Sequence, residues 1–200
     1  MSFRDLAWVV LDLETSGGRP IAHWDRQGRF RPAAEITEVG LVQGLGPLRQ
    51  GSFTSLCAIE GPLPRFITHL TGISTAMLVD APPWSTLVEP LTAHLEGRLW
   101  VAHHAAFDGA FLQAYLPEAF WSRHHLICTL KLAKHLIPEA PNRSLSSLSA
   151  ILGLRNRCPH RALPDAEATA ELFQILLQRA EAQGWDLETL LKRGHQPWKV

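Results

Sequence analysis

The chain has 200 residues, of which 46% are hydrophobic and 19% are charged, and its formal net charge at pH 7 is zero. This length and apolar content fit one compact domain with a full hydrophobic core. The zero net charge argues against a protein that binds nucleic acid through a positive field over its whole surface.

The first part of the chain is predicted to be rich in strands. Three short apolar runs, bounded by turn residues, indicate strands. They cover residues 8–13, 36–42 and 52–59. Between the first two lies a polar loop, residues 17–34, which carries one histidine, one tryptophan and several arginines. A connection this long inside a compact domain is either functional or disordered, and the sequence leaves its role open.

From Pro64 onward the apolar residues recur at helical spacing. The predicted helices cover residues 83–95, 105–115, 130–136, 144–152 and 164–182. Two brief apolar runs predict the remaining strands, at residues 99–102 and 126–128. Strands followed by alternating helices and strands predict an α/β fold with a mixed sheet flanked by helices. We expect residues 1–182 to form the main domain and residues 183–200 a short C-terminal helix and tail.

Two carboxylates sit on the first predicted strand. Asp12 and Glu14 are two residues apart, so their side chains leave the strand on the same face. Adjacent carboxylates on an apolar strand repel each other and are costly to desolvate. Taken alone, the pair is better explained by a strand end at which both acids reach water.

Two further acids lie in the first turns of predicted helices. Asp108 and Asp165 could each act only as a capping acid that interacts with the helix dipole. Asp165, however, shares its side of the helix with Leu172, Phe173 and Leu176, so it faces the core. A buried acid needs a compensating charge, and a divalent metal ion can supply it.

His160 precedes Asp165 by five residues and lies just outside the predicted helix. A single loop histidine is usually an ordinary surface residue. Here it is tethered to a candidate metal ligand, which is a suitable position for a general base. Because the ordinary pKa of histidine is about 6.5, its imidazole can accept a proton near neutral pH.

The order and spacing of these segments resemble the DEDDh 3′–5′ exonucleases, the family of the proofreading epsilon subunit of bacterial DNA polymerase III. The resemblance covers about residues 8–180. It rests on the segments LDLETSG, EITEVGLV, HLTGIS, VAHHAAFDGAFL and HRALPDAEATAELF. It implies a ribonuclease-H-like, mixed five-stranded sheet. It also implies that two Mg²⁺ or Mn²⁺ ions bind to Asp12, Glu14, Asp108 and Asp165, with His160 as the base that deprotonates the attacking water.

The same resemblance suggests residues that contact the terminal nucleotide. They are Thr15, Leu70, Ile73, His104 and Phe107. For the apolar members an ordinary core role is the alternative. The family more often has asparagine at the position of His104, which puts the local hydrogen bonding in doubt. The loop at residues 17–34 is longer than in compact members, so no role can be carried over to it.

The resemblance implies release of nucleoside 5′-monophosphates from the 3′ end of single-stranded nucleic acid, with DNA as the preferred substrate. The alternatives are an RNA-trimming exoribonuclease of the same family and a non-catalytic nucleic-acid-binding or polymerase-associated module. A module that had lost its chemistry should lack at least one of the four carboxylates, and none is missing here. The sequence leaves open whether the chain acts alone, associates with itself or binds a DNA polymerase.

The charged residues are unevenly distributed in the second half of the chain. Seven basic residues face a single acid between Trp121 and Arg161, and six acids face one arginine between Ala162 and Leu190. Such runs usually form solvated faces. The alternative is a basic rim for phosphates beside an acidic metal pocket, which would make substrate binding sensitive to salt.

Cysteine usage and hydropathy bear on the cellular compartment. The three cysteines, Cys57, Cys128 and Cys158, show no CxxC pairing, which argues against a disulfide framework and fits a reducing cytoplasm. Their spacing to nearby histidines matches no common zinc finger. We expect no secretory segment and no membrane span, because the apolar runs are short and interrupted by charges.

Overall fold

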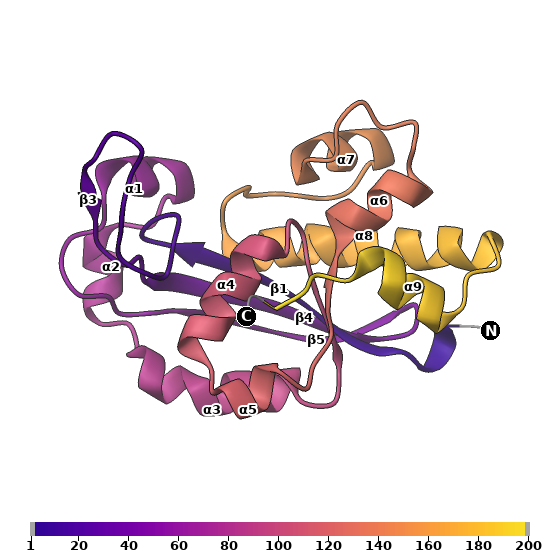
Figure 1. The fold of residues 1–200 in the computed structure, drawn as a ribbon, viewed down its shortest axis with the longest axis horizontal. Helices are drawn as coiled ribbons and strands as arrows, with labels where there is room; N and C mark the ends of the chain where they lie inside the picture. The colour runs from indigo at the N-terminus through magenta and orange to yellow at the C-terminus, as the bar shows by residue number, and fades with distance from the viewer. Residues whose placement is uncertain (1–2, 199–200) are drawn as a thin grey trace.

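The computed structural model describes residues 3–198 and is built around a mixed five-stranded sheet (Figure 1). The strand order is β5-β4-β1-β6-β7. β1 pairs antiparallel with β4 and parallel with β6; β4 pairs antiparallel with β5, and β6 parallel with β7. The strands are β1 (Ala7–Thr15), β4 (Ile36–Leu45), β5 (Leu48–Leu56), β6 (Leu99–Ala102) and β7 (Leu126–Cys128). The predicted α/β class and mixed five-stranded sheet are confirmed.

Helices flank this sheet. A 3₁₀ helix, η1 (Phe3–Asp5), precedes β1. The helices are α1 (Arg65–Thr71), α2 (Thr75–Val79), α3 (Trp84–Leu95), α4 (Ala106–Tyr115), α5 (Glu118–Trp121), α6 (Thr129–Leu136), α7 (Leu145–Leu152), α8 (Ala162–Ala182) and α9 (Leu187–Gly194). The longest, α8, packs along β4 and β1.

The alternation of side chains along β1 separates two cores. Trp8 and Val10 face one side of the sheet, where they pack with residues of α6, α7 and α8. Val9, Leu11 and Leu13 face the other side and pack with residues of α3 and α4. Because both faces of β1 are covered, its first residues are apolar without a break, which is the pattern that predicted a buried strand.

Gly40 allows α8 to approach the sheet closely. It lies on β4 directly opposite Asp12 of β1. A Cβ atom at this position would lie 2.3 Å from the carbonyl carbon of Ala162, the first residue of α8. The glycine therefore lets the N-terminus of α8 contact the strand backbone.

Several segments differ from the sequence prediction. β5 begins at Leu48, four residues before the predicted start, because the hairpin turn lies at Gly46 and Pro47. The first residues of β5 are exposed and show no apolar pattern, so the sequence did not mark them as a strand. α8 begins at Ala162, so Pro164 lies within its first turn, where its missing N–H costs no hydrogen bond. The long polar loop contains a small hairpin of β2 (His23–Trp24) and β3 (Phe30–Arg31).

The C-terminal residues pack against the main fold. Trp185 and Leu190 are buried in the core beside α8. After α9, the Gln196 amide donates to the Leu126 carbonyl of β7 at 2.8 Å. Across residues 3–198, no helix combines the length and the apolar character that a membrane span requires.

Candidate active site

β1 places two carboxylates on the face of the sheet that α8 covers. Asp12 and Glu14 continue the alternation of Trp8 and Val10, and both side chains are partly buried. They lie near the C-terminal end of the strand, beyond Val10, the last residue that pairs with β6. The two acids therefore lie beyond the end of the pairing between β1 and β6, while β1 stays paired with β4.

The backbone of β1 holds Asp108. The Leu13 amide donates to Asp108 Oδ1 at 3.2 Å. Asp108 lies in the first turn of α4 and is almost fully buried. Its carboxylate thus accepts a strand N–H at a point where β6 no longer pairs with β1, and this contact keeps Asp108 beside Asp12.

Asp165 comes from the first turn of α8 and is buried. Its Oδ1 accepts from Asn156 Nδ2 at 2.5 Å, and its Oδ2 accepts from the His160 amide at 2.9 Å. The loop before α8 therefore fixes the orientation of this carboxylate.

The structure brings these acids together from three separate segments. Asp12, Glu14 and Asp165 each offer one carboxylate oxygen, and these oxygens lie within 4.8 Å of one another. Among the described residues, this is the group of histidine, cysteine and acidic side chains with the spacing to hold a metal ion. Asp108 is outside the group of three, but its negative charge acts on Asp12.

Burial raises the pKa of all four acids, and repulsion from neighbouring site acids adds to the shift for Asp12 and Glu14. Burial raises the pKa of Asp12 well above its ordinary range, and the charges of Asp108 and Glu14 raise it further. Burial, together with Asp165, raises the pKa of Glu14 to about 8. Burial raises the pKa of Asp108 to about 7, although its hydrogen bonds oppose the shift. Burial also raises the pKa of Asp165, against the opposing hydrogen bond from Asn156.

This electrostatic pattern fits a site for divalent cations. Buried carboxylates that lie close together favour a nearby positive charge, which a divalent cation can supply. Hard carboxylate oxygens are the ligands that Mg²⁺ and Mn²⁺ prefer. The donor set and its spacing therefore fit a divalent cation.

His160 is held by its backbone while its side chain is exposed. Its amide donates to Asp165, and its backbone has a positive φ of 63°. This conformation is uncommon for a residue other than glycine, and such strained positions often occur at functional sites. The structure thus connects His160 to the carboxylate group through its backbone amide.

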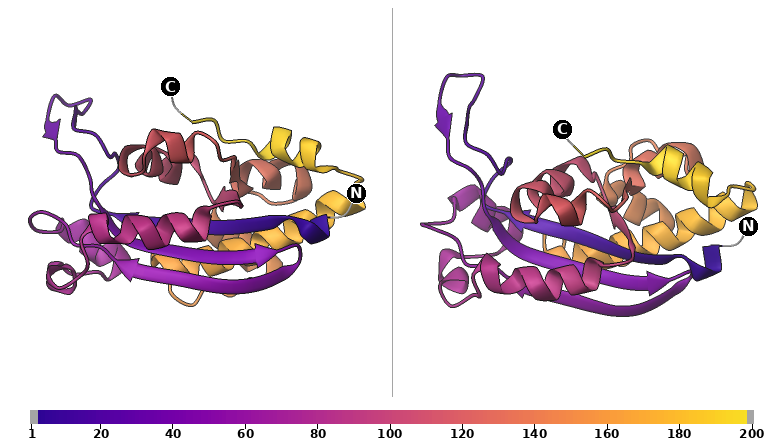
Figure 2. Two further views of the ribbon diagram at one scale, coloured as in Figure 1. Left: turned by 90° about the horizontal axis from the view of Figure 1, so that it is seen from below. Right: turned by 60° about the horizontal axis from the view of Figure 1, so that its bottom comes forward.

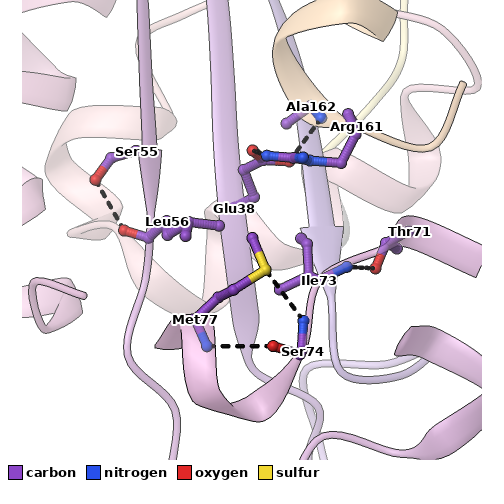
Figure 3. A network of polar contacts seen from close by, with 9 residues as sticks. All are labelled: Glu38, Ser55, Leu56, Thr71, Ile73, Ser74, Met77, Arg161 and Ala162. Atoms are coloured by element: carbon purple, nitrogen blue, oxygen red, sulfur yellow. Dashed lines mark hydrogen bonds and ion pairs between the residues drawn. The ribbon is translucent and has the colours of Figure 1, made fainter. Parts of the chain in front are cut away.

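Sequence reasoning did not identify the role of Glu38, which contacts Arg161 and Ala162 at the start of α8 (Figure 3). This residue lies on β4 opposite Glu14 and is only 4% exposed. Arg161 donates to it through Nη2 at 2.6 Å and through Nε, and the Ala162 amide donates to it at 2.9 Å. Glu38 therefore anchors the start of α8 to the sheet, beside Asp165. The only sequence signal was an acid within the apolar segment EITEVGLV, whose partner is 123 residues away.

The predicted nucleotide contacts occupy different environments. Leu70 is 48% exposed, and Phe107 is half-buried against Phe111. Thr15 is buried, and its hydroxyl donates to the Gly17 carbonyl at 2.6 Å. Ile73 has no exposed surface, and in this structure it is a core residue rather than a contact for a nucleotide.

His104 lies at the turn between β6 and α4, with a positive φ of 57°. It lines a hollow of about 780 Å³ that also includes His103, Asn142 and Arg143. The pKa of His103 is lowered to about 4, mainly by burial, so this ring is neutral at pH 7. The hollow thus combines one exposed histidine with one arginine near the start of α4, the helix that carries Asp108.

The family model described as exonuclease, of the RNase T type, matches residues 9–173. The chain belongs to this exonuclease family. Its motif order is that of the DEDDh 3′–5′ exonucleases, so the predicted resemblance is confirmed.

Two curated relatives illustrate the match. The chain is 34% identical over 188 residues to a Mycobacterium tuberculosis protein named as a bifunctional exonuclease/endonuclease, covering 92% of this chain but 28% of the relative. It is 29% identical over 176 residues to the DNA polymerase III epsilon subunit of Aquifex aeolicus, covering 87% of this chain and 82% of the relative. The chain thus spans less than a third of the first relative and most of the second.

The fold is shared with Escherichia coli exonuclease I, whose crystal structure contains a dT13 oligonucleotide. The TM-score is 0.73 at 14% identity, over 90% of this chain and 43% of the other. At this low identity, the similarity supports the ribonuclease-H-like fold alone.

Proposed function

We propose that this chain is a metal-dependent 3′–5′ exonuclease that hydrolyses the terminal phosphodiester bond of single-stranded DNA and releases nucleoside 5′-monophosphates. The observation that carries the proposal is the convergence of Asp12, Glu14 and Asp165, with Asp108 beside them, from three separate segments. Membership in the exonuclease family supports the same chemistry.

The four carboxylates would hold two divalent ions, Mg²⁺ or Mn²⁺. Such a pair, when bound, activates a water and neutralises charge on the leaving oxygen. The contribution of the protein is geometry: β1 fixes Asp12 and Glu14, the Leu13 amide holds Asp108, and Asn156 with the His160 amide orients Asp165.

His160 would act as the general base. Its exposed side chain can reach the solvent from which the attacking water comes, while its amide stays bonded to Asp165. Glu38 would act as a positioning residue, because its bonds to Arg161 and Ala162 hold the start of α8 next to His160.

The preference for DNA rests on the relatives. One relative is a DNA polymerase III subunit, and a protein of the same fold has been crystallised with a DNA oligonucleotide.

The choice between DNA and the RNA-trimming alternative is tested by digesting three matched substrates. They are single-stranded DNA, single-stranded RNA and a duplex with a mismatched 3′ end. Faster loss of the RNA would assign the chain to the exoribonucleases.

The metal-dependent activity is tested with a 5′-labelled strand. In Mn²⁺ the purified protein should shorten the strand stepwise, and EDTA should stop the reaction. Asp12→Asn should abolish it, whereas Asp5→Asn, an exposed acid in η1, should cleave like the wild type. If the wild type leaves the strand intact, or if Asp12→Asn is fully active, the proposal fails and a non-catalytic module is favoured.

Association with a DNA polymerase is a further prediction, supported by the name of the epsilon relative. Sedimentation of the purified chain, alone and mixed with the replicative polymerase of its source, would separate a monomer, a self-associated form and a polymerase complex.

A further inference from the structure

A two-stranded arm, residues 17–34, stands out from the rest of the molecule between β1 and β4 (Figure 2). Its base is fixed by hydrogen bonds. The Ser16 amide donates to the Glu35 carbonyl at 2.8 Å, and the Glu35 amide donates to Ser16 Oγ at 2.8 Å. The base therefore lies two residues from Glu14, at the end of β1 that carries the carboxylates.

The tip of the arm is an ordered hairpin. The Asp25 carboxylate accepts from the amides of Gln27 and Arg29 and from the guanidinium groups of Arg29 and Arg31. These bonds, led by that from the Arg29 amide, lower the pKa of Asp25 to about 2. Gly28 has the positive φ of 71° that such a tight turn needs. Local bonds thus shape the arm without a hydrophobic core.

Three large apolar side chains on the arm face solvent. Trp24 is 70% exposed, Phe30 is 56% exposed and Ile21 is 63% exposed. Trp24 and Phe30 are opposite each other across the hairpin, with ring centroids 5.5 Å apart in an edge-to-face arrangement. Exposed aromatic side chains that stabilise no core indicate a binding surface, and aromatic faces are suitable platforms for stacked bases.

The arm is also basic. It carries four arginines and a single acid, in a chain whose net charge is zero. All four arginines are exposed: Arg19, Arg26, Arg29 and Arg31. Aromatic side chains interleaved with arginines match the alternation of bases and phosphates in a single strand. A protein partner that covered this surface would instead need acidic groups opposite the arginines.

We propose that the arm binds the single-stranded part of the substrate on the 5′ side of the terminus held at the carboxylates. This inference rests on the proposed function. Each leg has about eight residues, and at about 3.3 Å per residue the arm reaches up to about 25 Å from its base. It would therefore contact nucleotides several positions from the 3′ end, and it would contribute to affinity for long strands rather than to chemistry.

The test compares substrates of two lengths. The variant Trp24→Ser/Phe30→Ser removes the stacking surface, and Leu48→Ser, a 67% exposed residue at the far end of the sheet, is the matched control. The wild type should have a lower KM for a dT20 strand than for dT3. In the arm variant this advantage should shrink about tenfold, the expected loss from removing one or two stacked bases. Leu48→Ser should keep it.

Binding is measured separately, by fluorescence anisotropy of labelled dT20 in EDTA, so that the result does not depend on cleavage. The arm variant should bind about tenfold more weakly, and Arg26→Ala should lower the slope of log affinity against log salt by about one. Equal affinity of the wild type and the arm variant for dT20 would overturn the proposal, even if the protein is an active exonuclease. A loss of binding would support the proposal even if no cleavage is seen.

Discussion

At the scale of single residues, His160 carries a sharp prediction about the chemistry. Its positive φ makes alanine a poor replacement, because alanine would add backbone strain, whereas asparagine tolerates this conformation. His160→Asn should keep Mn²⁺ binding, since the four carboxylates remain. It should lower kcat by about 10²–10⁴-fold, the usual contribution of a general base. Rates on a 5′-labelled strand and titration calorimetry with Mn²⁺ measure the two effects.

The control is His135→Ala, which removes an exposed histidine of α6 and should leave kcat unchanged. If His160→Asn retained the full rate near neutral pH, His160 could not be the base. If it lost Mn²⁺ binding instead, the main role of the residue would be to orient Asp165.

The raised pKa values predict how stability depends on pH without metal. With a pKa of about 8 for Glu14, the folded protein retains a proton that the unfolded chain has released well below pH 7. Between pH 7 and 8.5 the folded state binds more protons than the unfolded state, so the free energy of unfolding falls as pH rises. The slope is at most about 1.4 kcal/mol per pH unit for each retained proton. The lowered pKa of His103 acts in the opposite direction, but below this window.

Denaturation in EDTA at pH 7 and pH 8.5 measures this effect. Glu14→Gln should flatten the dependence, because the glutamine does not titrate. Added Mn²⁺ should stabilise the protein more at pH 8.5, where fewer protons compete for the carboxylates. Stability in EDTA that rises with pH over this window would mean that the pKa of Glu14 is not raised in the folded protein.

Which site residues could be predicted from the sequence depends on how local their signal is. Asp12 and Glu14 stood out because two acids two residues apart are unusual on an apolar strand, but only their combination with the segments of Asp108, His160 and Asp165 favoured a metal site over a strand end in water. The role of Glu38 was not recognisable, because its meaning depends on Arg161, and no local pattern connects residues so far apart. For Ile73 the sequence left a nucleotide contact and a core role open, because an apolar residue in a loop between two helices does not reveal whether it is buried; its burial favours the core role.

At the scale of elements, strands with two buried faces were predicted well and exposed ones poorly. β1 and β6 are buried along most of their length, so their apolar runs mark them clearly. β5 is an exposed edge strand, and β2 and β3 have two residues each and little contact with a core. Their pairing is set by turns and backbone bonds, which leave no apolar alternation to detect.

The close packing of β4 against α8 depends on the absence of a side chain at Gly40. In Gly40→Ala the new Cβ would meet the backbone of Ala162 and Leu163 at 2.3–2.4 Å, so the start of α8 must move outward. Asp165 would then move away from Asp12. We expect at least a tenfold loss of Mn²⁺ affinity and about 1–3 kcal/mol of lost stability, as for other overpacked sites. Calorimetry with Mn²⁺ and thermal denaturation measure both.

Gly51→Ala is the matched control, because its Cβ would make only an ordinary contact with Gln43 at 3.6 Å. It lies on the neighbouring strand β5 and should change neither quantity noticeably. Wild-type Mn²⁺ affinity in Gly40→Ala would show that α8 can be displaced without disturbing the carboxylates.

At the scale of the whole molecule, the contacts of residues 183–198 indicate that the C-terminal segment is part of the folding unit. Residues 183–198 bury Trp185 and Leu190, and Trp198 donates to the His124 carbonyl while packing on Trp100. Burial of Trp185 and Leu190 alone contributes about 3–6 kcal/mol, a large part of the whole stability of a typical domain. We therefore expect residues 1–182 alone to unfold or aggregate.

Leu190→Ala should lower the free energy of unfolding by about 2–5 kcal/mol, and the exposed Lys192→Ala should lower it by less than about 0.5 kcal/mol. Circular dichroism and urea denaturation measure these differences. If residues 1–182 fold with the stability of the full chain, the segment is an appendage, as the sequence suggested.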